Sequence, residues 1–325
     1  MRPFDYSSPN STSEVITQLD SATRPYAGGT DLLTRMKQDI TTPQHLVDIK
    51  NTDLSADIEE TENGLTLGAL VTLTDIEMNP LLKEKYTLLH EGAALAATPQ
   101  LRNRATLAGN LLQRPRCWYY RNSHIDCWLK GGEGCPAKGG QNQHHALFGE
   151  SPCVAVHPSD LASCLTALNA SVTLRGPNGE RDLPLTELYQ LPEDGRRQET
   201  VIKDNELILS ITVPKLSEGA VSTYLKAMDR KVWAFALVGL AAVLKIEGSK
   251  ISDARLTLSG VANIPWRLSK ADEELVGKEP SKELFAKVAE TALANATPLE
   301  QNAYKVPLAK RLIKRALSDL AGLET

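Results

Sequence analysis

The sequence predicts an α+β protein of two domains, and the order of its apolar patterns leads to this class. From the N-terminus to about residue 217, short strand-like runs alternate with helical patterns. Beyond that point three strand-like runs come first and helical patterns follow, which is typical of a separate α+β unit. The chain has 325 residues, enough for two or three domains at roughly 150 residues each. We therefore expect domains over 1–217 and 218–325.

The N-terminal end of the chain predicts a small unit of strands and helices. Ser13 can cap a short helix that ends near Gln18, because its hydroxyl can accept a free N–H group of the first turn. A strand then ends at Tyr26-Ala27, and two glycines lead into a helix over about 30–37. The apolar run 44–49 predicts a second strand.

The rest of the first domain predicts further strands and helices, of which the hairpin at 171–184 is the clearest. There Asn178-Gly179 separates two alternating runs, and this dipeptide favours a two-residue turn. Cys164 lies among leucines and alanines in a helix that follows residues 157–160, so we expect it in the core. The polar segment 190–204 contains Pro and Gly and predicts a surface loop. The other predicted elements are strands at 64–70 and 206–214 and helices at about 74–83 and 86–97.

In the second domain the runs 222–230, 235–248 and 252–262 predict a three-stranded antiparallel sheet. The middle run contains FALVGLAAVL, whose apolar character alone would also suit a buried helix. The turn at Glu247-Gly248-Ser249 and the alternating run after it favour a strand. Helical patterns close the chain at about 269–277, 281–296 and 307–322.

The composition argues against nucleic acid as a partner and against membrane insertion. The net charge of −4 is spread along the chain, so no basic patch indicates binding to a nucleic acid or an anionic membrane. No apolar run reaches the roughly 20 residues that a membrane-spanning helix needs. The start of the chain has no hydrophobic stretch either. We therefore expect a cytoplasmic protein, or a periplasmic one that is exported together with a signal-bearing partner subunit.

Two glycine-containing segments predict loops that could hold a phosphate group. In RPYAGGTDLL (24–33) a strand runs into two glycines and a helix N-terminus, where missing Cβ atoms and free N–H groups let a phosphate approach the backbone. TLAGNLLQ (106–113) has similar ingredients, and the two loops together could hold a diphosphate. The first segment is not GxGxxG, so a Rossmann nicotinamide site is disfavoured. The alternative is an ordinary tight turn that leads into a capped helix.

Four of the five cysteines, Cys117, Cys127, Cys135 and Cys153, fall within 37 residues. The stretch that holds the first three is rich in glycine and aromatic residues and poor in aliphatic ones, so it cannot form a core of its own. Four thiolates around iron could hold such a loop in place. Zinc is an alternative, although separations of nine, seven and seventeen residues lack the CxxC pairs usual in zinc ribbons. Buried thiols usually lie in apolar runs, and disulfides need an oxidising compartment.

Taken together, six segments resemble the FAD-binding medium subunits of the xanthine dehydrogenase family of molybdenum hydroxylases. They span nearly the whole chain: AGGTDLL (27–33), LRNRATLAGNLLQ (101–113), HPSDLA (157–162), ELILSITVP (206–214), YLKAMDRKVWAFALV (224–238) and SGVANIPWR (259–267). The cysteine segment further resembles a 4Fe–4S-containing branch, which includes the FAD subunit of a periplasmic aldehyde oxidoreductase and the β subunit of 4-hydroxybenzoyl-CoA reductase. Segment 224–238 looks closer to the aldehyde oxidoreductase branch.

This resemblance implies a fold and a separate function for each subunit of a complex. The fold is a two-subdomain α/β FAD-binding domain of the PCMH or vanillyl-alcohol-oxidase type, followed by the C-terminal α+β domain. Its subdomains lie at about 1–55 and 56–217, with a 4Fe–4S loop at 114–153. In the family a large subunit binds the molybdopterin and a small subunit carries 2Fe–2S clusters. The medium subunit takes electrons from those clusters at its FAD and passes them to an external acceptor.

The resemblance also implies which residues bind the cofactors. The residues that would wrap the FAD diphosphate are Tyr26, Ala27, Gly28, Gly29, Thr30, Asp31 and Leu32. Thr106, Gly109 and Asn110 would form the second FAD loop. Asp160, with Ser159 before it, would hydrogen-bond the flavin or its ribityl chain, and Ile208 and Lys226 would lie near the ring. The 4Fe–4S cluster would be ligated by Cys117, Cys127, Cys135 and Cys153.

Three other functions stay open at this point. The chain could be a β subunit like that of 4-hydroxybenzoyl-CoA reductase, a self-contained FAD oxidase, or a flavin-free scaffold stapled by zinc. An oxidase would need an acid or base of its own beside the flavin. His144-His145 could link a flavin, but paired histidines in a polar loop are more often solvent-exposed, which is what we expect here.

Overall fold

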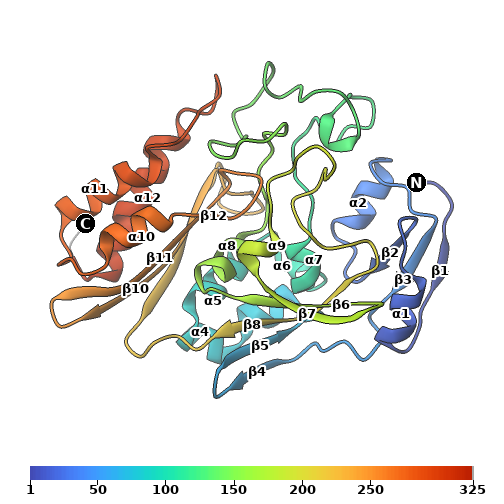
Figure 1. Ribbon diagram of the computed structural model, residues 1–325, viewed down its shortest axis with the longest axis horizontal. Helices are drawn as coiled ribbons and strands as arrows, with labels where there is room; N and C mark the ends of the chain where they lie inside the picture. The colour runs from blue at the N-terminus through green and yellow to red at the C-terminus, as the bar shows by residue number, and fades with distance from the viewer. Residues whose placement is uncertain (324–325) are drawn as a thin grey trace.

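The N-terminal part of the protein contains a three-stranded parallel sheet (Figure 1). A computed structural model describes residues 1–323 and places β1 (Asp5–Ser7), β2 (Thr23–Tyr26) and β3 (His45–Asp48) in the order β1-β3-β2. The helices α1 (Thr12–Gln18) and α2 (Leu32–Lys37) connect these strands. Ser11 caps α1 by accepting the N–H of Glu14, so the predicted cap Ser13 is wrong by two residues.

The middle part contains a five-stranded sheet that is antiparallel throughout, in the order β4-β5-β8-β6-β7. Its strands are β4 (Ile58–Thr61), β5 (Gly64–Gly68), β6 (Ser171–Gly176), β7 (Gly179–Pro184) and β8 (Leu207–Pro214). The hairpin of β6 and β7 confirms the turn predicted at Asn178-Gly179, where Gly179 has a φ of +108°. Leu207 of β8 packs with Val15 and Val47, which joins the first sheet to the second.

Short helices pack around this second sheet. They are α3 (Leu73–Met78), α4 (Pro80–Lys85), α5 (Thr87–Ala94), α6 (Pro99–Arg102), α7 (Leu107–Leu111), α8 (Asp160–Ala167) and α9 (Leu185–Leu188). The single helix predicted over 74–83 is divided, because Asn79 caps a new helix that starts with Pro80. All residues of α8 are buried, and Cys164 belongs to the core as predicted.

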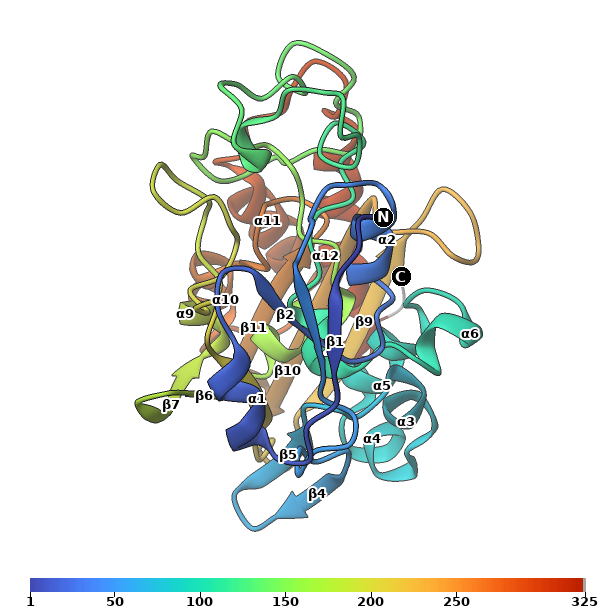
Figure 2. The same cartoon turned by 90° about the vertical axis from the view of Figure 1, so that its right-hand side faces the viewer.

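A long irregular segment joins α7 to α8 and carries the four clustered cysteines. Its residues 114–153, here called the cysteine loop, contain one regular element, the 3-10 helix η1 (Trp128–Lys130). The loop lies at one end of the molecule, above the sheets and beside the C-terminal helices (Figures 1 and 2). It does form a small apolar cluster, which is built around two of the cysteines: Tyr120, Cys127, Trp128, Leu129, Cys153 and Ala155. The expectation that it has no core of its own is therefore wrong.

The C-terminal part contains an antiparallel sheet in the order β12-β11-β10-β9. Its strands are β9 (Val221–Ala227), β10 (Val238–Glu247), β11 (Lys250–Ser259) and the short β12 (Trp266–Arg267), which adds a fourth strand to the three predicted. The helices α10 (Ser269–Leu275), α11 (Lys282–Leu293) and α12 (Lys305–Leu320) cover one face of this sheet. Strand β10 confirms the choice of strand over helix for its apolar run.

β10 is apolar on both faces because each face joins a different core. Ala241 and Val243 belong to the core of the middle part, whereas Leu240 and Leu244 pack with α10, α11 and α12. A strand that is buried on both faces has a continuous apolar sequence rather than an alternating one. The sheet therefore lies between the middle part and the C-terminal helices (Figure 1).

The predicted α+β class is confirmed, while the domain ranges 1–217 and 218–325 stay a prediction. The last two residues of the second range lie outside the described residues. Within residues 1–323, no helix combines the length and the apolar character needed to cross a membrane.

Candidate functional site

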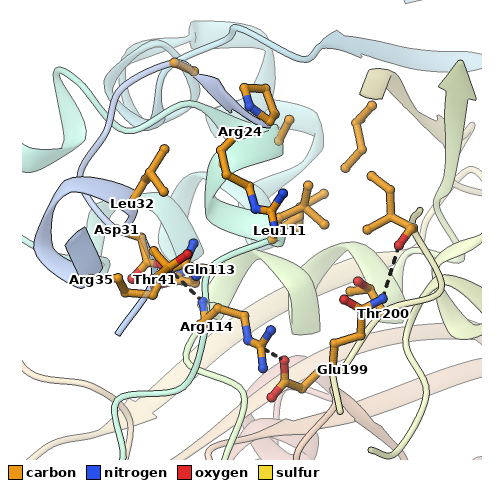
Figure 3. A pocket seen from close by; sticks show the side chains of 18 of the residues that line it. Arg24, Asp31, Leu32, Arg35, Thr41, Leu111, Gln113, Arg114, Glu199 and Thr200 are labelled. Atoms are coloured by element: carbon orange, nitrogen blue, oxygen red, sulfur yellow. Dashed lines mark hydrogen bonds and ion pairs between the residues drawn. The ribbon is translucent and has the colours of Figure 1, made fainter. Parts of the chain in front are cut away.

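A cavity of about 550 Å³ lies between the N-terminal and middle parts of the protein (Figure 3). Its walls come mainly from three segments: 27–32 after β2, 106–114 around α7, and 197–208, which leads into β8. The volume falls within the roughly 300–1,000 Å³ of pockets that hold small molecules and cofactors.

The first wall is the turn in which β2 passes into α2. All six residues of segment 27–32 line the cavity. Tyr26 does not line it, and the centroid of its ring lies 4.0 Å from the ammonium of Lys50. A Cβ atom on Gly28 would lie 1.8 Å from the carbonyl oxygen of Arg104. Gly29 has a φ of +71°, and its Cβ would lie 2.6 Å from the Tyr26 ring. The close packing of the chain itself therefore requires both glycines.

The second wall is formed by the start of α7 and the residues after it. The hydroxyl of Thr106 caps this helix by accepting the N–H of Gly109 at 3.3 Å, and both residues line the cavity. Asn110 and Ser159 do not line it. Instead, the Ser159 hydroxyl donates to Oδ1 of Asn110 at 2.5 Å and joins α7 to the start of α8. These two residues support the wall from outside the cavity.

The third wall was not identified from the sequence, apart from Ile208. Most of it falls in the segment 190–204, which the polar composition assigns to a surface loop. Glu199 is only 3% exposed, and its carboxylate lies 3.1 Å from Nε of Arg114 (Figure 3). Glu199 and Thr200 are thus buried at the cavity, whereas Glu193 and Asp194 are exposed, as a surface loop predicts. Composition does not distinguish these two cases.

The cavity carries more positive than negative side chains. Six cations and four carboxylates line it: Arg24, Arg35, Arg114, Lys130, Arg197 and Lys203 against Asp31, Glu199, Asp204 and Glu206. Surplus positive charge in a concave site attracts anionic ligands. The cavity therefore suits an anionic ligand such as a diphosphate.

Asp160 and Lys226 lie together but outside this cavity. The ammonium of Lys226 donates to Oδ2 of Asp160 at 2.8 Å and to the carbonyl of Leu95 at 2.9 Å, and both side chains are almost completely buried. The hydroxyl of Tyr224 donates to the other oxygen of Asp160. Asp160 also lines a smaller cavity of about 190 Å³, and His157 lines both cavities.

The four clustered cysteines are free thiols that lie close enough to affect one another electrostatically. Burial raises the pKa of Cys117 to about 11, with smaller contributions from the charges of Cys127 and Cys135. Burial likewise raises the pKa of Cys153, and repulsion by Cys135 and Cys117 adds to it. Cys127 and Cys153 belong to one apolar cluster, and Cys117 packs against it.

Backbone hydrogen bonds form part of the surroundings of these thiols. Backbone N–H groups approach three of the sulfurs, for example that of Ala155, which lies 3.4 Å from Sγ of Cys153. Hydrogen bonds to sulfur are a regular feature of iron–sulfur sites. Among residues 1–323, no three His, Cys, Asp or Glu side chains come close enough to share one metal ion.

A histidine that the sequence did not single out as buried lies against this site. His144 is exposed, as expected, but the expectation is wrong for His145. His145 is buried, and its Nε2 lies 3.2 Å from Sγ of Cys117. Burial lowers the pKa of His145 to about 4, so the ring is neutral at pH 7.

The chain matches two protein-family models along nearly its whole length. Residues 2–216 match the FAD binding domain in molybdopterin dehydrogenase. Residues 223–320 match the CO dehydrogenase flavoprotein C-terminal domain.

Two characterised relatives are similar over almost their full length. The aldehyde oxidoreductase FAD-binding subunit PaoB of Escherichia coli is 37% identical over 325 residues, which cover 98% of each chain. The carbon monoxide dehydrogenase medium chain of Hydrogenophaga pseudoflava is 29% identical over 322 residues, covering 97% of this chain and 96% of the relative. Among solved structures, a chain of a Cu,Mo-CO dehydrogenase is 26% identical with a TM-score of 0.79, and 99% of this chain and 98% of that one are covered.

Proposed function

The chain belongs to the FAD-binding medium subunits of the molybdenum hydroxylase family, and from this membership we propose that it is the FAD- and 4Fe–4S-containing electron-transfer subunit of an aldehyde oxidoreductase. In this role it receives electrons from the 2Fe–2S clusters of a small partner subunit and passes them to an external acceptor. A large partner subunit with molybdopterin converts the aldehyde. We place the complex in the cytoplasm, or in the periplasm by export with a signal-bearing partner.

The observation that carries this proposal is that the large cavity and two of the four cysteines have neighbouring side chains in common. Tyr120 and Leu129 line the cavity and also pack with Cys127 and Cys153 in one apolar cluster. A cofactor in the cavity and a cluster on the thiols would therefore lie on two sides of the same residues. This arrangement suits electron transfer between two redox groups.

The residues of this chain have separate tasks in holding FAD, which when bound supplies reversible electron transfer. Segment 27–32, with Thr106 and Gly109, cradles the diphosphate, and the surplus cations of the cavity neutralise it. Ile208 supplies an apolar wall. We propose that the flavin end extends past His157 toward the smaller cavity, where Asp160 can accept a hydrogen bond.

The assignment to aldehyde oxidation rests on two lines of support. The relative with 37% identity is described as an aldehyde oxidoreductase FAD-binding subunit. In addition, the cysteine loop resembles the 4Fe–4S-containing branch of the family, to which such subunits belong. We assign the four loop cysteines as the cluster ligands.

A visible spectrum of the purified full-length chain tests the cofactor content. Flavin bands together with a broad iron–sulfur shoulder, and iron and labile sulfide near four per chain, are the expected result. Flavin bands without iron would contradict the 4Fe–4S assignment and leave the FAD assignment in place. A colourless protein would favour a scaffold and contradict the FAD assignment as well.

Activity assays test the division of labour among subunits. With a panel of aldehydes and a dye acceptor, the isolated chain should show no turnover, and turnover should appear when the large and small subunits are added. Steady multiple turnover by the isolated chain would overturn the subunit assignment in favour of a self-contained oxidase.

A further inference from the structure

We propose that Asp31 is a positioning residue that couples the large cavity to the cysteine loop, so that FAD binding and ordering of residues 114–121 favour each other. This inference rests on the proposed FAD site, but it does not depend on which metal group the cysteines hold. It concerns the side chain of Asp31, whereas the proposed diphosphate site uses the backbone of segment 27–32.

The carboxylate of Asp31 contacts the cysteine loop and does not cap its own helix. Asp31 is the N-cap of α2, yet its carboxylate makes no capping hydrogen bond. An aspartate at this position ordinarily accepts an N–H group of the first turn. Here Oδ1 lies 2.8 Å from Nη1 of Arg116 and 2.7 Å from Nη2 of Arg121, and Oδ2 accepts the backbone N–H of Arg114 at 3.2 Å. The first residues of the cysteine loop are thus gathered around one carboxylate.

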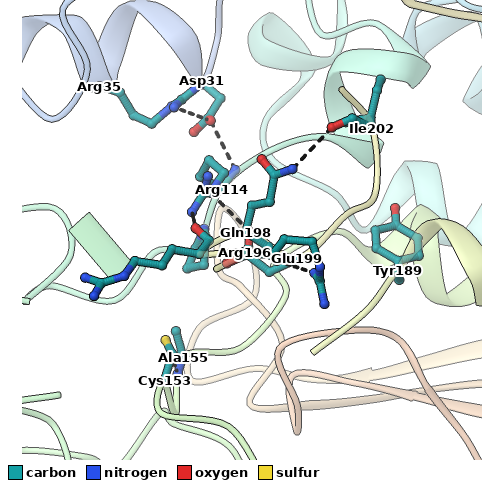
Figure 4. Close-up of polar contacts among 12 residues, drawn as sticks. Asp31, Arg35, Arg114, Cys153, Ala155, Tyr189, Arg196, Gln198, Glu199 and Ile202 are labelled. Atoms are coloured by element: carbon teal, nitrogen blue, oxygen red, sulfur yellow. Dashed lines mark hydrogen bonds and ion pairs between the residues drawn. The ribbon is translucent and has the colours of Figure 1, made fainter. Parts of the chain in front are cut away.

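A fourth arginine reaches the same carboxylate from within α2. Nε of Arg35 lies 3.1 Å from Oδ2 of Asp31 (Figure 4). Both Arg35 and Asp31 line the large cavity, and so does Arg114, whose guanidinium is paired with the buried Glu199 (Figure 4). The network therefore connects the cavity wall directly to the loop.

The arginines repel one another, and Asp31 holds them together. Burial raises the pKa of Asp31, but the guanidiniums of Arg116, Arg35 and Arg121 outweigh this effect and keep the pKa below its ordinary value. The side chains of Asp31 and Arg121 are only 10% and 11% exposed, so their charges are weakly screened.

The repulsion among these arginines makes the order of the loop depend on whether an anionic ligand occupies the cavity. Four guanidiniums surround the carboxylates of Asp31 and Glu199, so this network next to the cavity carries a surplus of positive charge. Two of the four, Arg35 and Arg114, line the cavity itself. A diphosphate in the cavity reduces the repulsion among them and so stabilises the ordered loop segment. Because coupling between two equilibria is reciprocal, an ordered segment strengthens FAD binding by the same factor.

Hydrogen exchange of the full-length chain tests the coupling. Amide exchange in residues 114–121 is compared with and without saturating FAD in the wild type, in Asp31→Asn and in Asp204→Asn. Asp31→Asn keeps the shape of the side chain and removes its charge. Asp204 is the matched control, because it also lines the cavity but pairs with Arg24 and not with the cysteine loop.

In the wild type and in Asp204→Asn, FAD should slow exchange of this segment about tenfold, within the roughly 5- to 150-fold usual for coupled sites. In Asp31→Asn the effect of FAD should fall below about twofold although FAD still binds, and Asp31→Glu should restore part of it. Arg121→Gln removes the ion pair with Asp31 by changing the residue in the cysteine loop, and it should act like Asp31→Asn. It therefore serves as a second variant if Asp31→Asn does not fold.

An undiminished effect of FAD in folded Asp31→Asn and Arg121→Gln would overturn the coupling while leaving the FAD site intact. Failure of the wild type to bind FAD is a different result, because it overturns the proposed function and this inference together.

Discussion

The ammonium of Lys305 donates to the carbonyl oxygen of His145 at 3.0 Å and thereby ties the first residue of α12 to the cysteine loop. The same ammonium donates to the carbonyl of Gly260 at 2.8 Å. The side-chain amide of Asn302 donates to the carbonyls of His145 and Ala146, both at 3.0 Å. The C-terminal part of the chain thus holds one side of the cysteine loop, while Asp31 holds the other.

The buried charge of Lys305 predicts a pH dependence of stability. Burial lowers the pKa of Lys305 to about 7, from an ordinary value of 10.5. Between these two values the unfolded chain binds more protons than the folded one, so this residue makes the free energy of unfolding rise with pH. Below about pH 7 both states are protonated and the full cost of the buried charge remains. The slope is at most about 1.36 kcal/mol per pH unit.

Urea unfolding at several pH values from below 7 to near 10 checks this prediction. Lys305→Met should remove this contribution to the rise, whereas Lys314→Met, which changes an exposed lysine of the same helix, should leave it in place. Equal slopes for the wild type and Lys305→Met would show that the lysine does not change its protonation in this range.

Cys127→Ser should remove iron and labile sulfide from the purified chain, because a 4Fe–4S cluster needs its four thiolates. The loop over 115–150 should then become sensitive to protease. Cys164→Ala is the control, since Cys164 is a core residue of α8 and should leave the iron content unchanged. Iron at full stoichiometry in Cys127→Ser would contradict the ligand assignment.

Gly28→Ala should abolish or strongly weaken FAD binding. Its Cβ would lie 1.8 Å from the carbonyl oxygen of Arg104, so the first wall would have to move away from the segment that leads into the second wall. Fluorescence titration with FAD measures the effect, and the C-terminal sheet should remain folded. Gly139→Ala is the matched control, because no atom lies within 4 Å of the Cβ added there. Unchanged FAD affinity in Gly28→Ala would mean that these walls do not hold the cofactor.

The pair of Lys226 and Asp160 should show strong coupling in a double-mutant cycle. Lys226→Met alone leaves the Asp160 carboxylate buried without its cation and should cost about 3–5 kcal/mol of unfolding free energy. Adding Asp160→Asn should recover much of this loss, because the remaining groups are neutral. Urea unfolding of the two single variants and the double variant gives the coupling energy. Additive losses would indicate that the two side chains do not interact.

Local sequence patterns predicted those elements whose cause is itself local. The Asn178-Gly179 hairpin follows from the backbone preference of two residues, and Cys164 lies in an apolar helix that is buried on every side. The glycines of segment 27–32 were found in the same way, because a strand, two glycines and a helix start are adjacent in the chain.

The parts that escaped prediction depend on partners far apart in the sequence. Glu199 is buried because Arg114 neutralises it, and nothing near Glu199 in the chain reveals that partner. His145 is buried by contacts to Cys117 and to the start of α12. The family resemblance assigns Asn110 to the second FAD loop, whereas the structure pairs it with Ser159 outside the cavity.

The hydrogen bonds between the start of α12 and the cysteine loop also mean that the loop is synthesised before the residues that hold it in place. Lys305 is synthesised 160 residues after His145, which takes about 8–32 s at the usual 5–20 residues per second. During this interval the cysteine loop lacks its C-terminal anchor, because Asn302 and Lys305 do not yet exist. Only after α12 docks are the carbonyls of His145 and Ala146 held by these two side chains.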